Sequence, residues 1–436
     1  MRIIAATLVV FLSFQAKANY AEFFGTAPST SSIGNQANSD EFDPANNYYI
    51  PALMAFSDTL TFSTSIASVS TDFEPITSIV TKNSTNSTTG TESGPVSTEY
   101  PSYLGSSLHV TLPIAVEGAG TVSFSLFMPL GKTMETNSGD AHLPEYVMYR
   151  SRYRRTMIHL NYAHKLSDNF AFSIGSHIGF QAGANTTNNV SLNGTSFGTS
   201  AGLKTEVKPS LAAIVSTIYR KDNWSAAFTY QQEMKSNLET QANGVINDPT
   251  SALFQITIES MIYYDPHIFR FGGAFEVGNF TFLGTLEYQL WENYKTPVIR
   301  VKDRGGVIIA SDDFEKVQLR NVPVPKIGTT LKLNDNLTLM AGLSYKPTPL
   351  KGNFSGSGNS IDSNSLILTG GGSISMKFFG KDLDLSAGAQ YHKLEELNVT
   401  KTPNQENGSA GSKIGAPGYK VGGSVIAASG GLRLKF

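Results

Sequence analysis

Apolar and polar residues alternate with a period of two along much of the chain. In 170–180, small or polar residues occupy one face and apolar residues the other, namely Phe170, Phe172, Ile174, Ile178 and Phe180. The same alternation returns in 224–231, 280–290, 337–345 and 383–391. A period of two places successive side chains on opposite faces of a sheet. The chain is therefore predicted to be all-β, with one apolar and one polar sheet face.

Short and long connections alternate between these segments. The short ones are rich in Asp, Asn and Gly, which tolerate positive φ and favour tight hairpins; they span 166–169, 220–223, 277–279, 333–336 and 380–383. The opposite connections are long and polar, as in the predicted loop at 183–205. Short turns at one end and long loops at the other are typical of outer-membrane barrels. A secreted β-sandwich shares the composition, but its loop lengths would be more evenly mixed.

The pattern predicts fourteen strands that close into an antiparallel transmembrane β-barrel. An even number returns the chain to its starting side, and closure leaves no unpaired edge in lipid. Pro266 interrupts the eighth range, which is either one strand or a short strand with a folded loop. The predicted ranges are 59–71, 103–114, 120–130, 149–165, 169–181, 207–220, 223–235, 254–276, 279–292, 322–333, 337–346, 364–378, 382–393 and 421–436.

The last predicted strand has two faces of different character. Ile426, Leu432 and the terminal Phe436 alternate with Arg433 and Lys435. Apolar side chains toward lipid and charges toward a lumen are the favourable arrangement at membrane depth. An aromatic end of this kind resembles the C-terminal signature of outer-membrane proteins, so we expect the barrel-assembly machinery to recognise it. An edge strand of a sandwich is the alternative.

Composition narrows the class of protein. Residues 1–18 are expected to be an export signal, because Arg2 precedes an apolar stretch and Ala16, Lys17 and Ala18 form a small-x-small cleavage site; the alternative is a buried N-terminal helix. The formal net charge is −2, so the chain carries no overall positive charge that would attract nucleic acid. The chain has no cysteine, which excludes disulfides and cysteine-based metal sites or nucleophiles.

Signals for catalysis are weak. Two G-x-S-x-G matches, 194–198 and 198–202, overlap inside the polar loop, whereas a nucleophile elbow needs a strand before it and a helix after it. The seven histidines show no metal-binding spacing. We therefore expect no enzyme, no metal and no cofactor. Among the charges expected in the lumen, Arg270 and Glu287 lie on neighbouring strands and are predicted to pair diagonally.

A basic cluster lies at the loop end of the fourth predicted strand. Arg150, Arg152 and Arg154 are candidates to bind the carboxylate of a ligand, or phosphates of lipopolysaccharide, through bidentate contacts. A solvated rim that binds nothing specific is the alternative.

About forty residues separate the expected cleavage site from the first strand, enough to fold into a lumen. Their acidic and Asn-rich stretch leads to the turn Ile50, Pro51, Ala52. This stretch resembles the N-terminal hatch of the FadL-type outer-membrane transporters of long-chain fatty acids and other hydrophobic compounds, and the likeness spans essentially the whole mature chain. The family's turn usually reads Asn-Pro-Ala, so Ile50 stands in place of an Asn. The resemblance implies a hatch over 19–57 and a barrel over 58–436.

The third predicted strand carries a second resemblance to this family. The family has an inward kink in this strand, which opens the barrel wall. Pro129 cannot donate a ladder hydrogen bond and Gly131 permits bending, so both favour a break here. The alternative is a proline that merely ends the strand.

The resemblance implies a channel for passive uptake of a hydrophobic small molecule, located in the bacterial outer membrane and working as a monomer. The solute would leave sideways through the gap in the third strand, and lipid and lipopolysaccharide would surround the barrel. Two other functions remain open on the sequence: a narrow general porin for small hydrophilic solutes, and an adhesive surface barrel acting through its long loops.

Overall fold

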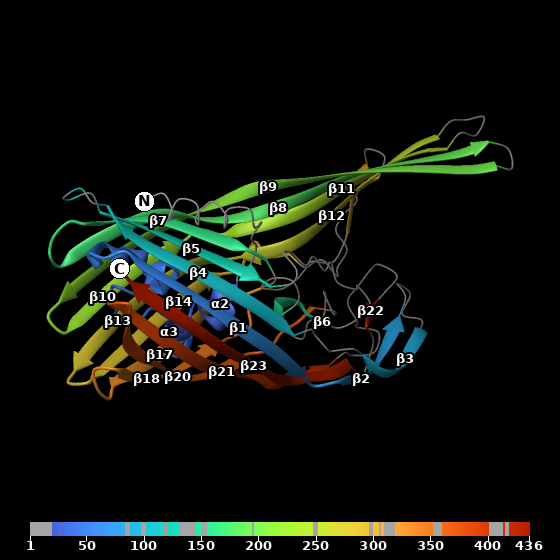
Figure 1. The fold of residues 1–436 in the computed structure, drawn as a ribbon. Helices are drawn as coiled ribbons and strands as arrows, with labels where there is room; N and C mark the ends of the chain where they lie inside the picture. The colour runs from blue at the N-terminus through green and yellow to red at the C-terminus, as the bar shows by residue number, and fades with distance from the viewer. Residues whose placement is uncertain are drawn as a thin grey trace.

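A computed structural model describes residues 20–82, 88–96, 102–114, 116, 118, 120–130, 145–149, 155–193, 196–246, 252–295, 300–304, 307–308, 319–351, 360–400, 413–414 and 418–436. Strands dominate these ranges (Figure 1). No helix within them is long and apolar enough to cross a bilayer. The expected signal at 1–18, Gly131, and the basic residues Arg150, Arg152 and Arg154 lie outside the described residues.

Fourteen antiparallel wall segments, two of them formed by consecutive strands, make up the barrel in the described part of the chain. They are β1 (Thr61–Phe73), β4 (Tyr103–Pro113), β5 (Thr121–Pro129), β7 (Met157–Lys165), β8 (Phe170–Asn193), β9 (Ser196–Lys221), β10 (Trp224–Gln231) with β11 (Met234–Ile246), β12 (Ala252–Asp265) with β13 (His267–Val277), β14 (Phe280–Leu290), β17 (Val322–Lys332), β18 (Leu337–Lys346), β20 (Ser365–Phe378), β21 (Lys381–Thr400) and β23 (Gly418–Lys435).

Shorter elements complete the described chain. The helices are α2 (Tyr20–Phe24), α3 (Pro28–Ser31), and the 3-10 helices η1 (Pro44–Tyr48), η2 (Pro51–Phe56) and η3 (Val147–Tyr149). The short strands are β2 (Ile76–Lys82), β3 (Thr88–Val96), β6 (Glu145–Tyr146), β15 (Arg300–Arg304), β16 (Val307–Ile308), β19 (Ser360–Ile361) and β22 (Lys413–Ile414).

The sheet closes because the first strand pairs with the last. β1 is antiparallel to β4 on one side and to β23 on the other, with Thr61 opposite Lys435 and Phe73 opposite Gly423. Closure confirms the predicted all-β, fourteen-stranded barrel. The eighth wall segment does break at Pro266, since β12 ends at Asp265 and β13 begins at His267.

The predicted alternation separates the two faces of the wall. Ile174, Phe271 and Phe282 are each more than half exposed on the outside, where the bilayer lies, whereas Ser173 and Arg270 are buried on the inside. This is the arrangement that a lipid-facing surface and a polar interior require.

Two strands run much further than the sequence predicted. The loop expected at 183–205 is instead a paired extension, in which β8 and β9 stay in register as far as Asn193 and Ser196. β11 joins this arm in parallel with β8 at 240–243, and the arm projects well beyond the barrel (Figure 1). Outside the bilayer a strand needs no apolar face, so its polar sequence carries no period-two signal.

The fourth wall strand is shorter than predicted. The sequence placed it at 149–165, but β7 begins at Met157, and Val147–Tyr149 form the 3-10 helix η3.

The last residue caps the seam between the first and last strands. The backbone N–H of Phe436 donates to the carbonyl of Leu60 at 3.0 Å, and the residue is 51% exposed.

Deleting Phe436 should remove both the seam contact and the terminal aromatic. We expect less heat-modifiable, folded barrel in outer-membrane fractions, measured by gel shift. A folded yield equal to wild type would contradict this role.

Candidate functional site

Residues 20–57, called here the N-terminal segment, lie inside the barrel (Figure 1). Ala21, Tyr48 and Ala52 are fully buried. The side chain of Asn47 donates to Ser125 Oγ of β5 at 3.0 Å. On the other side of the lumen, Gln390 Nε2 of β21 donates to the carbonyl of Phe24 at 3.0 Å. The segment therefore bridges opposite walls of the lumen.

The turn at Ile50, Pro51 and Ala52 begins η2. Pro51 takes the first helical position, where its missing N–H is least costly, and Ile50 precedes it without any side-chain cap. An Asn at Ile50 would be able to cap the N-terminus of this helix, whereas Ile is not. Ile50 packs instead between the two larger apolar clusters of the interior, and Ala52 is buried in one of them.

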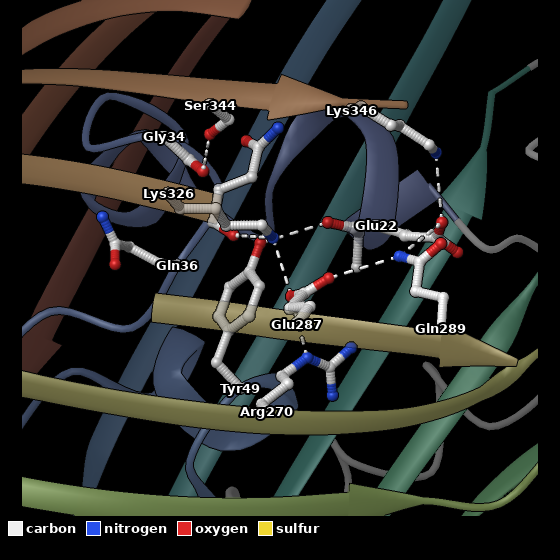
Figure 2. Close-up of polar contacts among 12 residues, drawn as sticks. Glu22, Gly34, Gln36, Tyr49, Arg270, Glu287, Gln289, Lys326, Ser344 and Lys346 are labelled. Carbon is white, nitrogen blue, oxygen red and sulfur yellow. Dashed lines mark hydrogen bonds and ion pairs between the residues drawn. The ribbon is translucent and has the colours of Figure 1, made fainter. Parts of the chain in front are cut away.

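A buried network of charges joins the wall to the segment (Figure 2). Arg270 Nε lies 2.9 Å from Glu287 Oε1. The two residues face each other directly across the β13–β14 ladder, so the diagonal arrangement predicted from the sequence is wrong. Lys326 Nζ of β17 lies 2.7 Å from the same carboxylate oxygen and donates to the carbonyl of Asn35, also at 2.7 Å.

A second ion pair extends the network toward α2. Lys346 Nζ of β18 lies 3.2 Å from Glu22 Oε1, and Gln289 Nε2 donates to both Glu22 and Glu287 (Figure 2). Buried charges need partners of this kind, because removal from water costs several kcal/mol per ion. The network fastens the segment in the lumen. Lys326 was not among the lumen charges predicted from the sequence, although it falls on the inward face of β17 near the ladder partner of Glu287.

Aromatic residues fill the lumen at the loop end of the strands. Phe73 at the end of β1 stacks on Tyr146 with ring centroids 4.1 Å apart, and Phe127 near the end of β5 meets Tyr48 edge-on at 6.1 Å. Met157, the first residue of β7, belongs to the same buried cluster. We call this set the outer aromatic cluster: Phe23, Tyr48, Phe73, Tyr103, Phe127, Tyr146, Tyr149 and Met157. For Phe73, Tyr103, Phe127 and Met157, the signal in the sequence is an apolar residue at an inward position near the end of a wall strand.

The opposite end of the lumen is polar. A cavity of about 650 Å³ lies beside the short turns, between the N-terminal segment and the wall. Arg433 pairs with Asp40 of the segment and, at 2.6 Å, with Asp384 of β21. Arg220 of β9 pairs with Glu41 at 3.2 Å. We call this cavity the polar vestibule.

Asp40 keeps its charge in the vestibule. Burial raises the pKa of this carboxyl, but Arg433 and Lys435 outweigh burial and hold the pKa below its ordinary value of 3.8. The carboxylate therefore stays ionised and paired at neutral pH, and its contribution to stability is lost only as the pH falls through that lowered pKa.

Pro129 is the last residue of β5. It pairs with Gly105 of β4, whereas the ladder between β5 and β7 ends earlier, at Phe127 and Met157. The described part of β5 is otherwise continuous. Leu130 N donates to the carbonyl of Leu104 at 2.7 Å, so the polar groups of Leu130 point to β4. Those of Pro129 then point the other way, toward β7.

Replacing Glu287 with Gln should destabilise the barrel. Two buried cations, Arg270 and Lys326, would lose their shared counter-charge, which costs about 3–5 kcal/mol in the free energy of unfolding. Urea unfolding in lipid vesicles, followed by tryptophan fluorescence, measures this loss. The matched control is Asp382→Asn, which breaks the largely exposed pair with Lys377 and should change little. Equal midpoints for the two variants would show that the network does not hold the segment.

Solved structures share this fold across almost their whole length. A FadL homologue of Pseudomonas aeruginosa matches with a TM-score of 0.64 and 13% identity, covering 96% of this chain and 98% of that chain. The toluene transporter TodX of Pseudomonas putida matches with a TM-score of 0.54 and 13% identity, covering 95% and 99%. The toluene transporter TbuX of Ralstonia pickettii matches with a TM-score of 0.55 and 12% identity, covering 96% of this chain and 99% of that chain. At these identities the likeness shows the fold alone.

Two comparisons of the sequence show relatives and the family of the chain. Alkane uptake protein A of Marinobacter nauticus is 23% identical over 188 residues, which is 41% of this chain and 40% of that relative. The match thus spans less than half of the relative's length. The family model of the outer membrane protein transport proteins (OMPP1/FadL/TodX) matches residues 8–413. With the closed barrel, this locates the protein in the bacterial outer membrane: the chain belongs to the OMPP1/FadL/TodX family of outer membrane transport proteins.

Proposed function

We propose that this protein is a passive channel, not an enzyme, through which hydrophobic compounds cross the outer membrane. The observation that carries this proposal is the chemical division of the lumen, with the outer aromatic cluster at the loop end and the polar vestibule at the other. A hydrophobic solute gains about 25 cal/mol for each Å² of apolar surface that it buries. It is therefore expected to bind among the aromatic rings.

The same division favours a sideways exit. A solute that continued straight down would leave apolar surroundings for the vestibule, where Arg433, Asp384 and Arg220 are engaged in ion pairs. A solute that leaves through the wall passes from the aromatic cluster into lipid. The N-terminal segment then serves as a hatch that closes the direct route.

The end of the β5–β7 ladder is our candidate for the opening. Phe127 and Met157 are the last pair of that ladder and both belong to the outer aromatic cluster. Just beyond them, Pro129 offers no N–H on the side toward β7. Unpaired backbone groups are costly in lipid and tolerable where they line a cavity. The backbone donor that Pro129 lacks is therefore missing at the point where the β5–β7 ladder ends and the outer aromatic cluster contacts the wall.

Replacing Pro129 with Val should extend the ladder, because Val restores a donor and is a good strand former. We expect uptake of radiolabelled toluene and of a radiolabelled long-chain fatty acid to fall several-fold, at equal levels of heat-modifiable barrel. Pro113→Val is the matched control: Pro113 ends β4 at the opposite end of the wall and should leave uptake unchanged.

Uptake by Pro129→Val at the wild-type rate would contradict the lateral exit. Conductance of small ions by the wild-type protein in planar bilayers, without uptake of either hydrophobic solute, would favour the general porin instead.

A further inference from the structure

Two fully buried histidines lie side by side on the inner face of the barrel wall, beside the outer aromatic cluster. His159 of β7 is directly opposite His177 of β8, and the two rings stack with centroids 4.6 Å apart. The ring of His159 also meets Tyr48 at 5.0 Å and Phe127 at 5.9 Å, both edge-on. His159 is two positions from Met157 on the same face of β7, so it borders the candidate opening. We call His159 and His177 the histidine pair.

The ring nitrogens of His159 are buried without a hydrogen bond. Neither Nδ1 nor Nε2 has a partner in the described part of the chain. His109 of β4, two strands away, is satisfied instead: its Nε2 donates to the carbonyl of Thr26 at 3.0 Å, and its Nδ1 accepts from Ser125 Oγ at 2.8 Å. Buried polar side-chain atoms are in most cases hydrogen-bonded. His159 therefore has a hydrogen-bonding capacity that the described residues do not use.

His177 carries an unused donor, and its neighbours fix which nitrogen that is. Arg270 Nη1 donates to Gln231 Oε1 at 3.1 Å, so the amide nitrogen of Gln231 donates to His177 Nδ1, also at 3.1 Å. Because Nδ1 accepts, the proton of the neutral ring is on Nε2. This N–H has no hydrogen-bond partner among the described residues, since the carboxylate of Asp265 lies 3.9 Å away.

The charges near the histidine pair are already balanced. Asp265 forms a buried ion pair with Arg155, and Arg270 is paired with Glu287. Both cations therefore have a carboxylate of the protein as partner. A ligand carboxylate beside His177 would bring a second negative charge close to Asp265, and it would compete with that side chain for Arg155. The surroundings of the pair thus favour a ligand without charge.

We propose that the histidine pair binds the oxygen atom of a neutral, oxygen-bearing hydrophobic solute, such as a long-chain alcohol, whose hydrocarbon part lies among the rings of the outer aromatic cluster. The inference rests on the proposed function and names its class of solute. A hydroxyl oxygen accepts from His177 Nε2, and the hydroxyl proton is donated to a ring nitrogen of His159. An alkane has no group for either contact, and a carboxylate adds a charge beside Asp265.

The substitution His159→Phe tests the pair, because it keeps an aromatic ring and removes two nitrogens that bond to none of the described residues. We therefore expect it to fold at the wild-type level. The matched control is His164→Phe, the same change on the opposite face of β7. The probes are radiolabelled dodecane, dodecanol and dodecanoate, which share a chain length and differ in the end group. Initial uptake is measured in cells with equal amounts of heat-modifiable barrel, and cells without the protein give the background.

We expect the wild-type protein to take up dodecanol faster than dodecane or dodecanoate. His159→Phe should lower dodecanol uptake about two- to tenfold, which corresponds to the loss of one neutral hydrogen bond, and leave dodecane uptake unchanged. His164→Phe should match the wild type for all three solutes. If His159 had only a structural role, its substitution would change the three rates by the same factor or not at all.

The inference is overturned if the wild-type protein takes up dodecane or dodecanoate as fast as dodecanol, a comparison that needs no variant. It is also overturned if His159→Phe leaves dodecanol uptake unchanged or lowers dodecane uptake equally. If the wild-type protein takes up none of the three solutes above background, the proposed function itself fails, which is a different outcome from these.

Discussion

Every backbone N–H and C=O group in the hydrocarbon layer must find a partner within the protein, and the rest of this structure depends on that constraint. It forces the strands to close, and the pairing of β1 with β23 completes the ring. A ring of fourteen segments leaves an interior that has to be filled. The N-terminal segment fills it, and its own backbone groups then need partners on the wall.

The wall meets this second need in two ways. On the β17–β21 side, glycines let the backbone of the segment approach closely while Thr369 and Ser344 donate to its carbonyls. On the β7–β9 side, small apolar residues pack against η2 with few polar contacts. The charged network of Glu287 with Arg270 and Lys326 lies deep in the lumen and ties wall strands to the segment. The stretch at 32–35 is thus held by hydrogen bonds, whereas η2 is held mainly by apolar packing.

The sequence predicted the wall well because lipid imposes a strict rule on it. Where strands cross the bilayer, as at 170–180 and 280–290, one face must be apolar, and the period of two follows. The arm formed by β8 and β9 was not predicted, because a strand outside the membrane needs no apolar face and its sequence therefore lacks the period of two. The close contact of wall glycines with the segment was not predicted for another reason: Gly342 and Gly388 are distant in sequence, and only the strand register places them beside Ile33 and Ser32. Lys326 likewise joins Glu287 only through strand order.

In the proposed route, a hydrophobic solute binds at the loop end of the lumen and leaves through the wall without entering the polar vestibule. The most direct test is photo-crosslinking of the protein in lipid vesicles with a diazirine-bearing alkyl probe, followed by mass spectrometry of the labelled peptides. The account predicts labels on inward residues of the outer aromatic cluster, including Phe127 and Met157, and none on the vestibule strands near Asp384 and Arg433. Labelling of the vestibule at a level equal to the cluster would contradict it.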